Sequence, residues 1–166
     1  MYKILSATLA TGVMAAGIAQ AATTTTTFAV TATVQSTCSA TAATLAFPNY
    51  TPGGGAQTGN TTISVKCSKN TAFTVALNAG STTGDAFVQR LMGSGTNTLQ
   101  YNLYTSAALA TVFGDGSGGT GTANGTGLGI ATANSIQVFG QVPDSATNQA
   151  AVPGNYTDTI TVTVSY

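Results

Sequence analysis

Few residues in this chain could carry chemistry. The 166 residues include no His and no Glu, and the acids are Asp85, Asp115, Asp144 and Asp158. Without His there is no Ser–His or Cys–His pair for nucleophilic catalysis. The four Asp are scattered over expected loops and strand ends, so a paired-carboxylate site is not expected. We therefore predict a protein that is not an enzyme and needs no cofactor.

Two cysteines, Cys38 and Cys67, are the most informative reactive residues. An even cysteine count in an exported chain favours a disulfide. Free thiols and a metal site are the alternatives, although two Cys without His make a poor ligand set for a metal. We predict a disulfide and no metal.

A glycine-rich stretch at 114–119 formally matches the GxGxxG pattern of nucleotide-binding loops. That pattern needs a following helix, whose N-terminus faces the phosphates. Here more glycine follows, so we predict that 114–129 is a flexible loop or an open hairpin and binds no nucleotide.

The charge content of the chain is very low. Charged residues make up 5 %, and the bases are Lys3, Lys66, Lys69 and Arg90. Such a chain has no basic patch to neutralise phosphates, so nucleic acid is not an expected partner. The composition fits a chain that packs against copies of itself, and it equally fits a soluble monomer with a Thr- and Gly-rich surface.

Residues 1–21 have the pattern of a secretory signal. Lys3 supplies the positive end, an apolar run follows, and Ala19-Gln20-Ala21 is a small-x-small cleavage site. The run is too short and too rich in Gly, Ser and Thr for a spanning helix. The mature protein is expected to begin at Ala22 and to be exported.

The remaining pattern is that of an all-β protein. Short runs of alternating apolar residues, separated by Gly, Pro and Asn turns, predict a β-sandwich of about seven strands. A turn at Ser68–Asn70 suggests a hairpin, and Ser106 to Ala110 is the only expected helical turn. The expected strands cover 43–47, 61–67, 72–78, 86–92, 99–104, 135–142 and 154–166.

A separate strand is expected directly after the signal. From Phe28 the chain alternates, with Phe28, Val30, Ala32 and Val34 on one face, which predicts a half-buried strand. The chain also ends at Tyr166, inside its clearest strand, so we expect a sandwich that is one strand short, with an apolar groove and an unpaired edge. The first strand either folds back into its own groove or is lent to a neighbouring molecule.

Several stretches of the mature chain resemble one family. They are Cys38 itself, ISVKCSKNTAFTVALNAG (63–80), LQYNLYTSAALATVFGDG (99–116), VFGQVP (138–143) and PGNYTDTITVTVSY (153–166). Over nearly all of Ala22 to Tyr166 the chain resembles the spore coat protein U-like domain, found in major pilins of archaic, Csu-type, chaperone–usher pili. The resemblance implies an incomplete immunoglobulin-like sandwich that is completed by a donor strand from another chain.

The resemblance also implies partners and roles. A periplasmic chaperone lends a strand first, and at the outer-membrane usher the N-terminal strand of an identical or related pilin replaces it. Phe28, Val30, Ala32 and Val34 match the inward positions of the donor strand, and Cys38 and Cys67 match the family's disulfide. The edge strand that binds the chaperone corresponds to Tyr156, Ile160, Val162, Val164 and Tyr166.

Two functions follow from the sequence. The first is a shaft pilin, with a signal at 1–21, a donor strand at 22–36 and a pilin domain at 37–166, that polymerises at the cell surface for attachment and biofilm formation. The alternative is a closed, secreted coat-like or carbohydrate-binding module. A pilin should aggregate, exchange strands or need a chaperone, whereas a closed module should remain a monomer.

Overall fold

The computed structural model describes residues 20–166, so all but the last two residues of the predicted signal lie outside it. The chain divides into two compact units at Thr33/Val34. In the first unit, residues 20–33 form no strand or helix, and every one of them is exposed. Among residues 20–166, no helix is long and apolar enough to cross a membrane.

The half-buried strand predicted from Phe28 onward does not form within the single chain. The side chains of Phe28 and Val30 are 86 % and 84 % exposed, and residues 20–37 contain no strand. A strand needs a partner for its backbone groups and a surface for its apolar face. These residues have neither within their own unit.

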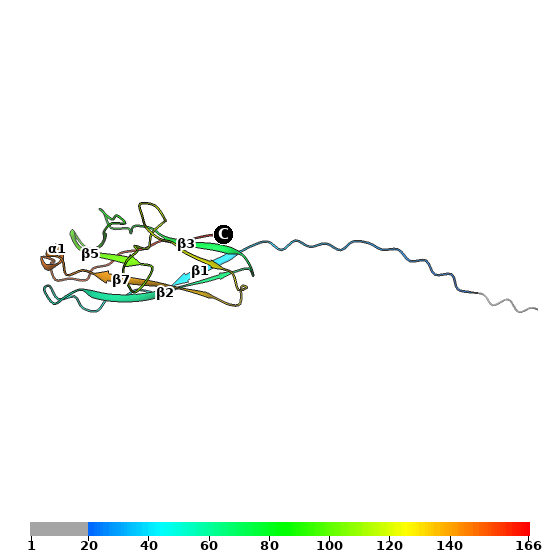
Figure 1. Cartoon of the computed structure of the whole chain (residues 1–166), viewed down its shortest axis with the longest axis horizontal. Helices are drawn as coiled ribbons and strands as arrows, with labels where there is room; N and C mark the ends of the chain where they lie inside the picture. Colours follow the sequence, from blue (N-terminus) through cyan, green and yellow to red (C-terminus); the bar gives the residue numbers. More distant parts are fainter. Residues whose placement is uncertain (1–19) are drawn as a thin grey trace, which may run out of the picture. The chain divides into compact units, whose positions relative to one another are not determined.

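Residues 34–166 form a sandwich of two antiparallel sheets (Figure 1). The larger sheet has the order β1-β2-β7-β5-β4 and the smaller sheet the order β6-β3-β8. The strands are β1 (Cys38–Ala42), β2 (Gln57–Cys67), β3 (Ala72–Leu77), β4 (Arg90–Ser94), β5 (Asn97–Tyr104), β6 (Ala123–Thr126), β7 (Asn134–Val142) and β8 (Val162–Ser165), with one short helix, α1 (Ala146–Gln149), between β7 and β8.

The core lies between the two sheets and explains the alternation in the sequence. Alternate residues of β2, β5 and β7 face alternate residues of β3, as expected where side chains point to opposite faces with a period of two. The buried apolar residues are Ile63, Val65, Cys67, Phe73, Val75, Leu77, Leu99, Tyr101, Leu103, Phe113, Val138 and Val142. The prediction of an all-β sandwich is confirmed.

The predicted hairpin at Ser68–Asn70 is wrong. β2 and β3 flank this turn but belong to different sheets, β2 pairing with β1 and β7 and β3 with β6 and β8. Both strands carry an apolar face, and crossing between the layers lets the two faces meet in one core. The turn is held instead by the segment after β6, through the bond from Asn70 N to the Gly127 carbonyl (2.8 Å).

Other strand boundaries also differ from prediction. The first strand is 38–42 and not 43–47, and the final strand covers only 162–165 of the predicted 154–166. The glycine-rich stretch contains β6, and 106–110 forms a turn without a helix. The bounds of the strands are set by pairing with neighbouring strands, which local propensity does not encode.

One arginine lies entirely inside the sandwich. Arg90 has no exposed surface, and its guanidinium donates to the Asn78 carbonyl (2.7 Å), the Phe113 carbonyl (2.7 Å) and Asn102 Oδ1 (2.7 Å). It also lies 5.5 Å from the ring centroid of Phe87. These bonds compensate part of the cost of burying its charge.

Candidate functional site: an apolar groove between two sheet edges

One edge strand of each sheet borders the same groove. β1 is the last strand of the larger sheet and β8 the last strand of the smaller one. Ala42 at the end of β1 and Val162 at the start of β8 both line one cavity of about 290 Å³. An unpaired edge on either side offers backbone donors and acceptors to an added strand.

The floor of this cavity is apolar. It is made by buried core residues of both sheets, namely Ile63, Leu77, Tyr101, Leu103 and Val138. Because their side chains already pack in the core, an apolar residue entering here would remove further apolar surface from water.

The groove continues into a second, larger cavity of about 720 Å³. The two cavities share Thr44, Leu45, Phe47, Met92 and Asp158. The second cavity extends to Tyr50 and Pro52 on one side and to Ala151 on the other. The segments 42–50 and 151–162 therefore form the two lips of one long groove.

One carboxylate, Asp158, lies on a lip of the groove and is held by hydrogen bonds. It accepts from the Tyr101 hydroxyl, from Ser81 N (2.9 Å) and from Thr159 N (2.7 Å). Burial alone raises the pKa of Asp158, but these hydrogen bonds outweigh it and lower the pKa below its usual value. Burial and the bond to Asp158 raise the pKa of Tyr101. Asp158 is therefore a fixed anion that anchors the lip to the 80–82 loop.

A second carboxylate, Asp144, fixes the far end of the groove. It accepts from the Tyr50 hydroxyl (2.5 Å) and from the backbone N–H groups of Gly53 and Gly55 (3.0 Å each). These bonds lower the pKa of Asp144, while burial and the same hydroxyl bond raise the pKa of Tyr50 to about 12. Both groups therefore keep their protonation states at neutral pH.

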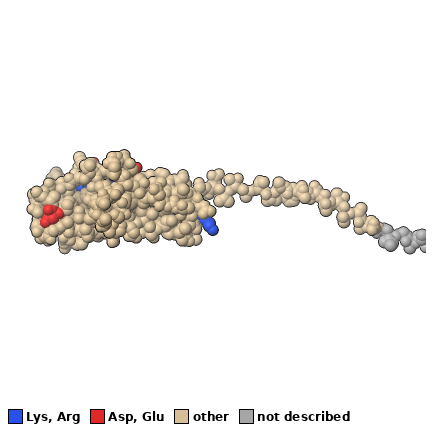
Figure 2. Space-filling model, viewed as in Figure 1, with Lys and Arg blue, Asp and Glu red and all other residues tan. Residues whose placement is uncertain are grey.

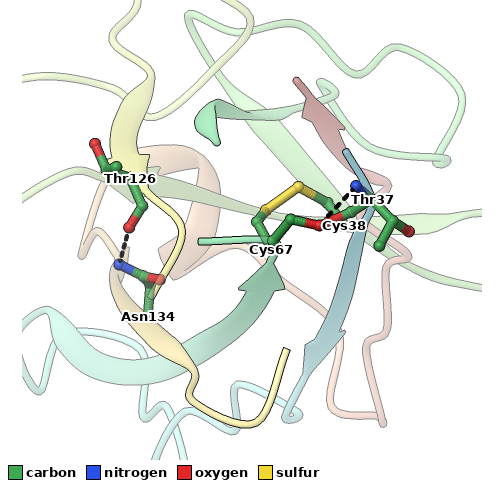
Figure 3. The surroundings of a disulfide bond; sticks show 6 residues. Thr37, Cys38, Cys67, Thr126 and Asn134 are labelled. Carbon is green, nitrogen blue, oxygen red and sulfur yellow. Dashed lines mark hydrogen bonds between the residues drawn. A yellow bond between two sulfur atoms is a disulfide. The ribbon is translucent and has the colours of Figure 1, made fainter. Parts of the chain in front are cut away.

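The predicted disulfide is confirmed. Cys38 and Cys67 are bonded and are direct partners in the β1–β2 register (Figure 3). Two more bonds continue this link, from Thr37 N to Ser68 Oγ (3.1 Å) and from Ser68 N to the Thr37 carbonyl (2.9 Å). β1, which forms the start of one lip, is therefore covalently attached where the chain enters the sandwich.

Removing the disulfide should strongly destabilise the sandwich. The bond closes a loop with a sequence separation of 29 residues, for which the chain-entropy model gives roughly 3–4 kcal/mol. We expect Cys67→Ser to lower the yield of the folded, exported chain, and Cys38→Ser to do the same. If non-reducing mass spectrometry found two free thiols in the unmodified mature chain, the disulfide between Cys38 and Cys67 would be contradicted.

Only two of the five predicted edge-strand residues lie in a strand. Val162 and Val164 belong to β8, whereas Tyr156 and Ile160 precede it and Tyr166 follows it. Ile160 and Val162 line the first cavity and Tyr156 the second, while Tyr166 is exposed. The prediction that all five form one strand is wrong, because the lip before Val162 is bonded to Gly93 of β4 and to the loop at Ser81. Their role toward a chaperone stays a prediction.

The opposite lip was not identified from the sequence. Leu45 and Phe47 line both cavities, and Phe47 packs edge-on against Tyr101 with 6.2 Å between ring centroids. Their alternation in 43–47 was a usable signal. The predicted donor residues Phe28, Val30, Ala32 and Val34 are all exposed, and their role also stays a prediction.

Comparison with known proteins gives a family and a fold. The Spore Coat Protein U domain matches residues 24–163. A similar solved structure is a chain of the chaperone–tip adhesion subunit pre-assembly complex from archaic chaperone–usher Csu pili of Acinetobacter baumannii, with 24 % identity and a TM-score of 0.51. The similarity covers 81 % of this chain and 41 % of that chain. No curated protein matches.

Proposed function

Because the chain belongs to the Spore Coat Protein U domain family, we propose that it is a structural pilus subunit that polymerises by donor-strand exchange. The observation that carries this proposal is the open apolar groove between two unpaired sheet edges. The fold is immunoglobulin-like, as in the Csu pilus complex. In the polymer, the N-terminal segment of one copy fills the groove of the next.

The length of the proposed donor suits the groove. Phe28 to Val34 spans six residue steps, roughly 20 Å when extended. The lip from Ala42 to Tyr50 has eight steps and is at most about 28 Å long. The donor segment therefore has room for its four inward side chains along the two adjoining cavities.

The chemistry of the donor also suits the groove. Phe28, Val30 and Val34 are exposed apolar side chains in the single chain, and burying each of the larger ones should contribute about 1.5–3 kcal/mol. Backbone bonds to the edges add roughly 0.5–1.5 kcal/mol each. A subunit alone leaves these groups and the groove in water, which favours pairing between copies.

The proposal includes an export route and an organisation of the chain. Residues 1–21 are the secretory signal, 22–36 the donor strand and 37–166 the pilin domain. A periplasmic chaperone occupies the groove first, and an outer-membrane usher exchanges it for the next subunit. The product is a surface pilus for attachment and biofilm formation, assembled without catalysis by the chain itself.

Electrophoresis of the assembled protein tests the proposal. We expect protein sheared from the cell surface to give a ladder of subunit multiples on unboiled denaturing gels, and to collapse to one band after boiling. The ladder persists because strand insertion buries a full set of backbone bonds and apolar contacts. A mature chain that elutes as a stable monomer and gives no ladder would favour the closed secreted module instead.

A further inference from the structure

Opposite charges lie at the two ends of the long strand β2. Exposed Lys66 and Lys69 flank Cys67, and Asp144 binds the 53–55 loop that precedes Gln57. β2 connects these places with 11 residues, so they are roughly 33 Å apart. We call 66–70 with 127–130 the lysine end, and 50–55 with 143–153 the aspartate end. Figure 2 shows a group of Lys and Arg atoms at one end of the domain and a group of Asp and Glu atoms at the other, with a smaller patch of each colour elsewhere on this face.

The other carboxylates also lie away from the lysine end. Asp85 and Asp158 bind the backbone of Thr82 and Ser81, which follow the far end of β3. Asp115 follows Gly114, whose carbonyl accepts from Leu77 N at that same end of β3 (3.0 Å). The two exposed lysines are therefore not neutralised by a carboxylate within their own end.

Both ends also expose apolar side chains. Leu128 and Ile130 are 55 % and 50 % exposed, and the segment that carries them is bonded to the lysine end from Gly129 N to the Cys67 carbonyl (3.1 Å). At the aspartate end, Val152 is 52 % exposed. Each end thus combines charge with apolar surface, and the charges are opposite.

A short tether would bring these two ends together in the proposed polymer. Thr37 is bonded to Ser68 at the lysine end, and only four residue steps, about 14 Å at most, separate Val34 from Cys38. The groove reaches the aspartate end at Tyr50 and Ala151. A donor whose Val34 lies there holds its own lysine end against the aspartate end of its acceptor. The reverse orientation would place two lysine ends together, which is electrostatically unfavourable.

We infer that the lysine end of one copy docks on the aspartate end of the next copy as a second interface, beside the donor strand. Lys66 and Lys69 face Asp144, and Leu128 and Ile130 pack on the surface around Val152. This inference rests on the proposed function. Contact between two different patches of the same chain does not close on itself, so it extends along a filament and fixes the angle between successive subunits.

Cysteine cross-linking tests the contact directly. Ile130→Cys and Val152→Cys are introduced together into the full chain, and pili are assembled in cells. We expect the double variant to keep its ladder after boiling without reductant and to lose it with reductant. Each single variant should boil to monomer. Mass mapping checks that the Cys38–Cys67 bond remains in all variants.

A charge-reversal arm tests the electrostatic part. In the cross-linking background, Lys66→Glu with Lys69→Glu should slow cross-linking about two- to fivefold at low salt, the size expected for exposed ion pairs. Thr147→Lys, on an exposed residue of α1 at the aspartate end, should restore part of the rate. The difference should vanish near 1 M salt, where the screening length is only about 3 Å.

The outcomes separate the two proposals. If the double variant shows a ladder before boiling and only monomer after non-reducing boiling, the end-to-end contact is wrong while donor-strand exchange stands. A ladder from Ile130→Cys alone, limited to dimers, would mean that two lysine ends meet, which also overturns it. If the unmodified chain gives no unboiled ladder, the proposed function fails, and the contact that rests on it fails too.

Discussion

Pili should not assemble from a Val30→Asp variant, whereas a Thr31→Asp variant should assemble nearly normally. Val30 belongs to the inward face of the proposed donor strand, and Thr31 to the opposite face. A carboxylate at position 30 would be buried in an apolar groove without a partner, which costs several kcal/mol, far more than the lost methyl groups. The same charge one residue later remains in water.

The two variants form a matched pair because they differ only in which face receives the charge. Unboiled gels of surface-sheared protein measure the ladder, and co-purification with the chaperone measures binding through the groove. Val30→Asp leaves its own groove intact, so the chaperone should still bind it. Equal ladders from the two variants, or loss of chaperone binding by Val30→Asp, would show that this strand is not a donor to a neighbour.

The second large effect is expected at the buried arginine. Arg90→Met should lower the free energy of unfolding by on the order of 3 kcal/mol or more, because three buried acceptors lose their donors. Those acceptors are the carbonyls of Asn78 and Phe113 and the side-chain oxygen of Asn102. A methionine side chain fills most of the volume of the arginine side chain, so the loss in free energy of unfolding comes from the missing hydrogen bonds and not from a cavity.

Lys69→Met is the control for this substitution. It removes one positive charge from an exposed residue and should change stability by less than about 0.5 kcal/mol. Guanidinium unfolding of the disulfide-bonded full chain, followed by circular dichroism, measures both. If Arg90→Met unfolded at the same midpoint as Lys69→Met, the bonds of Arg90 would not stabilise the sandwich.

Much of the fold was predictable because its signals are local. Alternation in 61–67, 72–78 and 99–104 marks the strands that supply most of the core, and Cys67 falls on the inward face of one of them. The even cysteine pair in a chain with an export pattern was enough to predict the disulfide. These features depend on residue type and a period of two.

The features that were missed depend on contacts distant in sequence. Whether a turn such as Ser68–Asn70 joins two strands of one sheet or two sheets is decided by which strands pair elsewhere. β6 is a strand because its residues pair with β3, despite the surrounding glycines. The buried state of Arg90 likewise depends on acceptors from Asn78 and Phe113, which no local pattern links to it.

The place of the disulfide has a mechanical consequence. A pull applied to the chain at Thr37 reaches Cys38, the first residue of β1, and passes at once through a covalent bond to Cys67 on β2. β2 is flanked by β1 and β7 and shares a nine-residue register with β7. The load therefore enters an interior strand, to which many backbone bonds contribute in parallel. The pulling force therefore does not break the hydrogen bonds of β1 one after another, and the lip of the groove that begins in β1 stays in place.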